Sequence, residues 1–295
     1  MTVSAQTAHA NGNGTAVDAA KYSKEVNTAR DYYNSDDADT FYHLCWGDGN
    51  GDHIHVGLYA EPQESIPVAA HRTVTTMASA LGLNSSMRVL DAGAGYGGSA
   101  RELAKTYGCR VTCLNLSDVE NARNVRLCRE RGLDKLVDVV DGSYEEIPFE
   151  DDSFDAVWSM DAFLHSGDRL KALKEIKRVL KPGGQFIFTD LMASDNPNPA
   201  VMQPILARLH LTTLGCPGWY KSELEKLGGK VQYTDHTDML TNHYRRVGEV
   251  LQERRHLMKG KISDKYIDTM SAGLDKWVSG GRSGDLAWGI THCRF

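Results

Sequence analysis

The chain has 295 residues, of which 41% are hydrophobic and 24% charged, and its formal net charge is −6. This composition is that of an ordinary globular protein, long enough for one large domain with an additional cap. It contains no apolar run of membrane-spanning length, no signal-peptide core and no polybasic block, so we expect neither a membrane nor a nucleic-acid partner. The six cysteines form no CxxC pair, which favours reduced thiols in the cytoplasm.

The first 82 residues divide into a tail and a cap. Residues 1–20 are small, polar and rich in glycine, which predicts a disordered tail. Residues 21–82 predict a helical and aromatic cap segment, with helices over 21–34 and 67–81, an acidic turn over 35–39 and a loop-like aromatic stretch between them. His53 and His55 alternate as on a strand, but no third ligand is suitably spaced, so no metal site is predicted.

Residues 83–295 predict one α/β domain. Strands are expected over 88–92, 110–116, 136–141, 154–160 and 185–191, with helices over 97–107, 118–131 and 168–180. Strands that alternate with helices imply right-handed βαβ units and a parallel sheet. The pattern then changes, and we expect helices over 200–214, 221–227, 238–258 and 264–278, with strands over 230–234 and 285–295.

A glycine-rich stretch separates the first predicted strand from its helix, with the sequence Asp91-Ala92-Gly93-Ala94-Gly95-Tyr96-Gly97-Gly98. Free backbone N–H groups and the helix dipole face a ligand at such a turn. Dinucleotide folds usually carry an apolar residue two positions before the first glycine, so Asp91 disfavours a nicotinamide enzyme and suits a cationic ligand. The pattern D-x-G-x-G-x-G resembles motif I of class I methyltransferases that use S-adenosyl-L-methionine.

Three later stretches resemble further motifs of that superfamily in the correct order. Asn115 ends the second strand, 20 residues after Gly95, where a polar side chain can bind ribose hydroxyls. The segment 142–149 resembles the one that covers adenine, the segment 154–160 with His165 resembles the next motif, and 180–184 completes the series. Together they imply a Rossmann-like class I fold: a seven-stranded, mostly parallel sheet with helices on both faces, an antiparallel last strand and a helical lid at about 238–280.

The same resemblance implies S-adenosyl-L-methionine as methyl donor, with S-adenosyl-L-homocysteine as product. Its expected binding residues follow the carboxyl ends of the strands: Asp91, Gly93, Ala94, Gly95, Asn115, Leu116, Gly142, Ser143, Tyr144, Ser159 and Met160.

From about Tyr32 to Trp288 the chain resembles a narrower family, the sarcosine/dimethylglycine N-methyltransferases that make glycine betaine. The matches include Asp31-Tyr32-Tyr33, Phe41-Tyr42 with Trp46-Gly47, His55-Val56-Gly57-Leu58-Tyr59, Cys113-Leu114-Asn115, Leu164-His165-Ser166-Gly167, Leu206-Ala207-Arg208, Asn242-His243-Tyr244 and Leu286-Ala287-Trp288-Gly289. The sequence departs from the family pattern in a longer loop over 48–52, in Glu120 for a glutamine and in Leu191 for a proline.

This resemblance implies N-methylation of sarcosine and dimethylglycine in the cytoplasm. Because the product is a quaternary cation, aromatic faces are its natural stabilisers. The expected catalytic residues are Tyr33, Trp46, His55 and His165, and the expected acceptor-binding residues are Tyr42, Arg208, Trp219, Tyr220, His243 and Tyr244. His55, His165 or His243 could accept the proton of the acceptor's amine. Alternatively, they could only hold neighbouring side chains or the substrate in position. Arg208 is the first choice for the acceptor's carboxylate and Arg245 the second.

Two alternatives stay open. One is methylation of another small acceptor, such as phosphoethanolamine or a secondary metabolite. The other is a protein that binds S-adenosylmethionine without turnover, although the aromatic set in front of the cofactor argues against it. The sequence fits a monomer or a homodimer.

Overall fold

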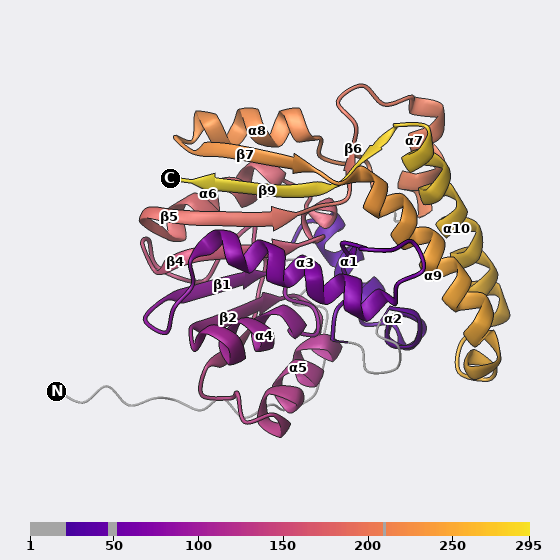
Figure 1. The fold of residues 1–295 in the computed structure, drawn as a ribbon, viewed down its shortest axis with the longest axis horizontal. Helices are drawn as coiled ribbons and strands as arrows, with labels where there is room; N and C mark the ends of the chain where they lie inside the picture. The colour runs from indigo at the N-terminus through magenta and orange to yellow at the C-terminus, as the bar shows by residue number, and fades with distance from the viewer. Residues whose placement is uncertain (1–21, 47–51, 209–210) are drawn as a thin grey trace.

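The computed structural model describes residues 22–46, 52–208 and 211–295, apart from the side chain of Arg208, so the predicted tail over 1–20 lies outside it. Seven strands form the main sheet in the order β3-β2-β1-β4-β5-β9-β7 (Figure 1). Their bounds are β1 Arg88–Ala92, β2 Arg110–Asn115, β3 Val137–Asp141, β4 Phe154–Met160, β5 Leu180–Thr189, β7 Lys230–Asp235 and β9 Gly289–Arg294. Only β9 runs antiparallel to its neighbours, β5 and β7. The predicted seven-stranded, mostly parallel sheet is confirmed.

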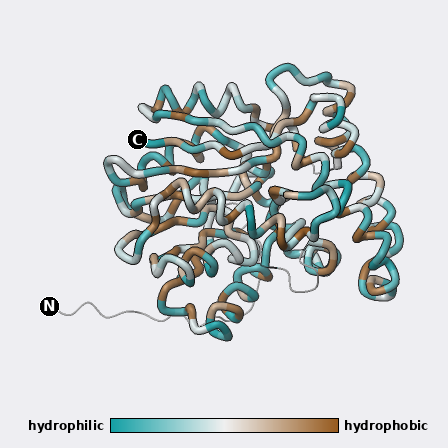
Figure 2. The backbone as a smooth tube through the Cα atoms, viewed as in Figure 1, coloured by the Kyte–Doolittle hydropathy of each residue, from teal (hydrophilic) through white to brown (hydrophobic). Residues whose placement is uncertain are grey.

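Helices cover both faces of this sheet. They are α3 (Ile66–Leu81), α4 (Gly98–Tyr107), α5 (Asp118–Glu130), α6 (Arg169–Val179) and α8 (Pro217–Lys226). In Figure 1, α3 crosses the near face of the sheet, while α6 lies behind it. Successive strand residues point to opposite faces, so Val89 and Trp158 join one core and Leu90 and Val157 join the other. In Figure 2 hydrophobic stretches follow the central strands, whereas the outer coil of α8 is largely hydrophilic.

The N-terminal segment is more helical than predicted. It forms α1 (Lys24–Tyr33) and α2 (Asp36–Cys45), so the predicted acidic turn over 35–39 and the following aromatic stretch are part of one helix. The Ser35 hydroxyl accepts a hydrogen bond from the Ala38 N–H, and three aspartates in the first turn favour the positive end of the helix dipole. The predicted strand-like alternation at His53 and His55 is wrong, because residues 52–59 form no strand.

Two long helices lie between β7 and the C-terminal strands, at about the predicted place. These are α9 (Thr237–Met258) and α10 (Asp264–Arg282), which pack side by side at one end of the sheet (Figure 1). Leu240, Tyr244, Val247 and Leu251 recur at helical spacing on α9 and are buried. The division of the chain into a cap over 21–82 and a domain over 83–295 with an inserted lid stays a prediction.

Several predicted boundaries are wrong for identifiable reasons. Leu180 starts β5 instead of ending α6, because the Pro182-Gly183-Gly184 stretch is part of the strand. The helix predicted over 200–214 is shorter, since α7 spans Pro199–Arg208. The last strand is split into β8 (Leu286–Ala287) and β9, and β8 pairs with β6 (Met192–Ala193). Among the described residues, no helix is long and apolar enough to cross a membrane.

Candidate active site

The glycine-rich turn after β1 shapes the floor of the site. Gly93 has a φ of +81°, a left-handed value that favours glycine. A Cβ atom at Gly93 would lie 2.4 Å from the Cβ of Ala162, and one at Gly98 would lie 2.0 Å from the Asp52 carbonyl oxygen. Because these two glycines have no side chain, Ala162 and Asp52 can pack directly against the turn. No side chain from Gly93 or Gly98 then fills the space at the end of β1.

A first cavity, of about 790 Å³, opens over this turn. Its lining includes eight of the predicted cofactor residues: Asp91, Gly93, Ala94, Gly95, Asn115, Leu116, Tyr144 and Met160. Of the predicted catalytic residues, Tyr33, His55 and His165 also line it. We call it the cofactor cavity.

Three predicted cofactor residues do not line this cavity. The Ser159 hydroxyl donates a hydrogen bond to the Ala92 carbonyl oxygen (2.6 Å) and is fully buried between two strands. The Ser143 hydroxyl accepts one from the Glu145 N–H (3.1 Å). Gly142 packs against Leu114, whose Cδ1 would lie 2.8 Å from an added Cβ.

Asp91 gives the cofactor cavity its acidic character. Its side chain is 2% exposed, and its Oδ2 atom has no hydrogen-bond partner in the described part of the protein. Burial raises the pKa of this carboxyl to about 7. A buried carboxylate oxygen on the cavity lining that has no hydrogen-bond partner in the described chain is suited to bind the ammonium group of a ligand.

Asn115 and Glu120 form a second polar group in the same cavity. The Asn115 amide Nδ2 donates to Glu120 Oε2 at 3.0 Å, and Glu120 Oε1 has no partner among the described residues. Burial raises the pKa of Glu120 to about 7. Free oxygens of this kind can accept hydrogen bonds from ribose hydroxyls. Glu120 is not one of the predicted site residues. The signal for it in the sequence is that it stands where the family pattern has a glutamine.

The buried carboxyls predict that binding of a cationic methyl donor depends on pH. Because the pKa of Asp91 is raised to about 7, this carboxyl takes up a proton and loses its charge as the pH falls through 7. We expect the affinity for S-adenosylmethionine to fall by up to about tenfold per pH unit below 7. Calorimetric titrations between pH 8 and pH 6 measure this. An affinity that stays constant over that range would contradict the prediction, and the slope left in Asp91→Asn would give the share of Glu120.

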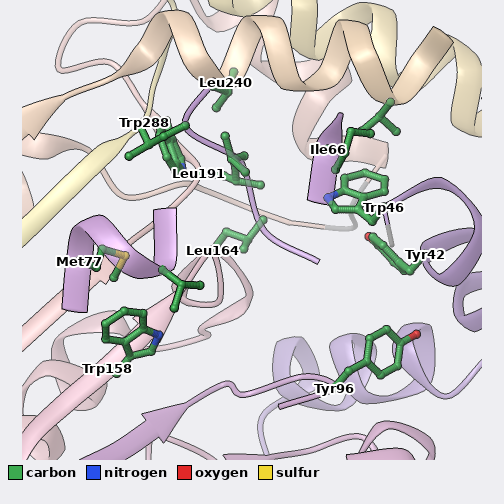
Figure 3. Packing of buried hydrophobic residues seen from close by; sticks show 14 of the residues in the cluster. Tyr42, Trp46, Ile66, Met77, Tyr96, Trp158, Leu164, Leu191, Leu240 and Trp288 are labelled. Atoms are coloured by element: carbon green, nitrogen blue, oxygen red, sulfur yellow. The ribbon is translucent and has the colours of Figure 1, made fainter. Parts of the chain in front are cut away.

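A second cavity, of about 460 Å³, adjoins the first. The predicted residues Tyr33, Tyr42, Trp46, His165 and Tyr244 line it, and we call it the acceptor cavity. Its other lining residues are Ile54, Val56, Asp161, Leu164, Leu191 and Trp277. Figure 3 shows Tyr42, Trp46, Leu164 and Leu191 within the hydrophobic packing. Since Tyr33, Ile54, Asp161 and His165 line both cavities, they form the wall that the two share.

Tyr33 and His165 are joined across this shared wall. The Tyr33 hydroxyl lies 3.0 Å from His165 Nε2, and the two rings meet edge to face with centroids 5.3 Å apart. Tyr33 also stacks on Tyr42, at a centroid distance of 5.8 Å. Burial lowers the pKa of His165 to about 4, so this histidine is neutral at pH 7. Its ring then has one nitrogen that donates a hydrogen bond and one that accepts.

Both ring nitrogens of His55 have neighbours at hydrogen-bond distance, whereas Nε2 of His243 is buried and has no partner among the described residues. His55 Nδ1 lies 3.1 Å from the Val56 carbonyl oxygen, and its Nε2 lies 3.2 Å from His53 Nδ1. His243 Nδ1 lies 2.8 Å from the Tyr59 hydroxyl, and its ring packs against Trp46 at 5.5 Å. Burial lowers both pKa values to about 3. Neither histidine lines the acceptor cavity, and the described residues contain no cluster of three or more side chains able to hold a metal ion.

The structure does not bring Trp219 and Tyr220 to either cavity. Tyr220, on α8, is fully buried, and its hydroxyl donates to Asp190 Oδ2 (2.7 Å). Trp219 packs against its ring. Arg208 ends α7, and its side chain lies outside the description. Arg245 donates to the Pro62 carbonyl oxygen (2.6 Å) and pairs with Glu249, away from both cavities.

Asp161 is a site residue that sequence reasoning missed. It follows β4 at the same sheet edge as Asp91 and has a φ of +49°. Its Oδ2 accepts from the Val56 N–H (2.7 Å) and its Oδ1 from Trp288 Nε1 (2.8 Å). Asp161 therefore ties the N-terminal segment and the C-terminal strands to the shared wall. Its position at a strand end was the one available signal.

Comparisons with known proteins agree with this geometry. Residues 90–188 match the family model described as a methyltransferase domain. The chain is 48% identical over 279 residues to a sarcosine/dimethylglycine N-methyltransferase of Halorhodospira halochloris, covering 94% of this chain and 99% of that one. It is 53% identical over 274 residues to a glycine/sarcosine/dimethylglycine N-methyltransferase of Actinopolyspora halophila, covering 92% of this chain but only 48% of that longer protein.

A solved structure is also similar. It comes from Galdieria sulphuraria and is provisionally named a sarcosine dimethylglycine methyltransferase. The two structures have a TM-score of 0.83 and 40% sequence identity, and the match covers 89% of this chain and 98% of the other.

Proposed function

This chain belongs to the family of sarcosine/dimethylglycine N-methyltransferases, and we propose that it transfers methyl groups from S-adenosyl-L-methionine to sarcosine and dimethylglycine, giving glycine betaine. One observation carries the proposal: an acidic cavity at a glycine-rich turn shares a wall with an aromatic one. A methyl group held in the first cavity beside the shared residues would lie next to the second cavity. An amine there could form the new N–C bond as the C–S bond breaks.

The cofactor cavity fits S-adenosylmethionine group by group. The molecule supplies, when bound, a methyl group activated by a sulfonium. Asp91 would accept its ammonium group, and Asn115 with Glu120 would bind its ribose hydroxyls. Tyr144 would lie beside it, fixed by the hydrogen bond from its hydroxyl to the Ala162 carbonyl oxygen (2.9 Å).

The acceptor cavity suits an N-methylated glycine. Tyr33, Tyr42, Trp46 and Tyr244 offer ring faces and edges to the charge that forms on nitrogen as the methyl group arrives. No covalent intermediate is needed, so orientation of the two reactants supplies most of the rate. His165 is neutral and hydrogen-bonded to Tyr33, which supports a positioning role for this pair.

The alternative of a phosphorylated acceptor is less well supported. Recognition of a phosphate group usually requires arginine or lysine. Among the described residues that line the acceptor cavity, the charged side chain is Asp161, which is acidic. A phosphate group carries up to two negative charges, so this carboxylate would repel it more strongly than the single carboxylate of an N-methylated glycine.

Arg208 remains the predicted partner of the acceptor's carboxylate. We expect Arg208→Met to raise the apparent KM for dimethylglycine by about tenfold, because a charge-assisted hydrogen bond is worth about 1.5–3 kcal/mol. The affinity for S-adenosylmethionine should hardly change. Steady-state kinetics with each substrate varied in turn measure this, with Arg245→Met as the matched control on the surface. Equal KM values in both variants and the wild type would contradict the role of Arg208.

We also propose a cytoplasmic location, which the six free thiols support, since cysteines in oxidising compartments usually pair. A monomer or homodimer and the lack of a nucleic-acid partner remain predictions, the latter supported by the net charge of −6.

The proposed reaction can be tested on a panel of acceptors. The protein is incubated with S-adenosylmethionine and glycine, sarcosine, dimethylglycine or phosphoethanolamine, and products are identified by mass. Methylation of sarcosine and dimethylglycine is the expected result. Methylation of phosphoethanolamine alone would favour the other acceptor class, and cofactor binding without any product would favour the non-catalytic alternative.

A further inference from the structure

Two buried N–H donors on residues of the acceptor cavity have no hydrogen-bond partner among the described residues. They are the Nε1 atoms of Trp46 and Trp277, whose side chains are 5% and 0% exposed. Both residues line the cavity, although Trp46 follows α2 and Trp277 belongs to α10. Buried polar groups in proteins almost always have a partner, so two unpaired donors around one cavity point to an acceptor that the ligand brings.

Three other polar side chains of this cavity, Tyr33, Tyr42 and Asp161, already have partners within the chain. The Tyr33 hydroxyl pairs with His165, and the Tyr42 hydroxyl lies 3.3 Å from that of Tyr32. Both oxygens of Asp161 accept hydrogen bonds from other parts of the chain. The two indole groups are therefore the donors best placed to receive an anionic group of the ligand.

Tyr244 packs against both indoles. Trp277 stacks on Tyr244 with centroids 4.9 Å apart and an interplanar angle of 15°, so one of its faces is covered. Trp46 meets the same tyrosine edge to face at 6.3 Å, so the two indoles flank Tyr244. In Figure 3 the indole nitrogen of Trp46 and the hydroxyl of Tyr42 lie on the side toward Leu164 and Leu191, which line the same cavity.

We propose that the indole N–H groups of Trp46 and Trp277 bind the carboxylate of the methyl acceptor. This assignment rests on the proposed function and specifies how its substrate class is recognised. A carboxylate offers about four lone-pair sites, so the two indoles leave room for Arg208 as well. With its carboxylate at the indoles, a small acceptor points its amine toward the shared wall.

Trp277→Phe tests the assignment, because it keeps an aromatic ring against Tyr244 and removes the N–H donor. It also removes part of the indole ring system, a loss of volume that the control variant below shares. The probes are glycine betaine, and tetramethylammonium, which carries the quaternary charge but no carboxylate. Both are titrated by calorimetry into the full-length protein saturated with S-adenosylhomocysteine. We expect the affinity for betaine to fall by about tenfold and that for tetramethylammonium to stay unchanged.

Trp158→Phe is the matched control. Trp158, on β4, also has a buried Nε1 without a partner in the described part of the chain, but its side chain packs in the core on one face of the sheet and lines neither cavity. This variant should leave both affinities unchanged.

The outcomes separate the assignment from the proposed function. A Trp277→Phe protein that binds S-adenosylhomocysteine and betaine as the wild type does would overturn the assignment. If this variant fails to bind S-adenosylhomocysteine, Trp46→Phe decides by the same comparison. A wild-type protein that binds S-adenosylhomocysteine but not betaine would instead overturn the proposed function.

Discussion

Replacing Asp91 with asparagine is expected to weaken the binding of S-adenosylmethionine by about 10- to 100-fold. The loss corresponds to one charge-assisted hydrogen bond from the ligand's ammonium group. The fold should survive, because Asp91 Oδ2 has no partner in the described structure and burial raises the pKa of this carboxyl to about 7. A neutral amide of the same shape avoids the cost of burying a charge, so the unfolding temperature at pH 8 should hold or rise.

Asp190→Asn is the control for this experiment. Asp190 is equally buried, and burial raises its pKa to about 7, but its oxygens accept from the Leu164 N–H (2.9 Å) and the Tyr220 hydroxyl. It lines neither cavity. This variant should lower the unfolding temperature and leave the cofactor affinity unchanged. If calorimetry gives Asp91→Asn the wild-type affinity, the assignment of the cofactor cavity fails.

Replacing Tyr33 with alanine is expected to lower kcat by about 100-fold, while the affinity for S-adenosylmethionine changes far less. Tyr33 lies in the shared wall, where its ring stacks on Tyr42 and its hydroxyl binds His165. Its removal takes away one aromatic face and the alignment of the two reactants, and misplacement by about 1 Å can cost about 100-fold. Single-turnover rates and cofactor titrations separate the two effects.

Tyr33→Phe and Tyr32→Phe refine this result. Tyr33→Phe keeps the ring and loses the bond to His165, so we expect a loss of about tenfold. The hydroxyl of the adjacent Tyr32 contacts Tyr42, but Tyr32 lines neither cavity, so Tyr32→Phe should be close to the wild type. Collapse of cofactor binding in Tyr33→Ala with unchanged acceptor kinetics would assign Tyr33 to the cofactor alone. Trp46→Ala would be harder to interpret, because the indole also packs against Phe41 and His243.

Sequence reasoning located the parts of the site that depend on local pattern. Asp91 and Asn115 stand at the ends of neighbouring parallel strands, and such ends meet at one edge of a sheet wherever the strands are correctly identified. The sequence pattern does not predict α2, because aspartates and serine are typical of turns as well as of a capped helix start, which Ser35 forms here.

The parts that depend on long-range packing could not be predicted in this way. Trp277 reaches the acceptor cavity only because α10 packs along α9, and Asp161 becomes a junction only when Val56 and Trp288 arrive from opposite ends of the chain. Conversely, Tyr220 is a suitable residue type in a plausible segment, but Asp190 holds its hydroxyl inside the core. Residue type and spacing do not reveal which side of a helix faces a cavity.

One incubation tests the central claim, that the methyl group of a cofactor in the first cavity is transferred directly to the amine of an N-methylated glycine in the second. The protein is supplied with S-adenosylmethionine that carries an isotopically labelled methyl group and with unlabelled dimethylglycine, and the products are resolved by mass. The account predicts glycine betaine bearing one labelled methyl group, with an equal amount of S-adenosylhomocysteine. Binding of S-adenosylmethionine without labelled betaine, from dimethylglycine at saturating concentration, would contradict it.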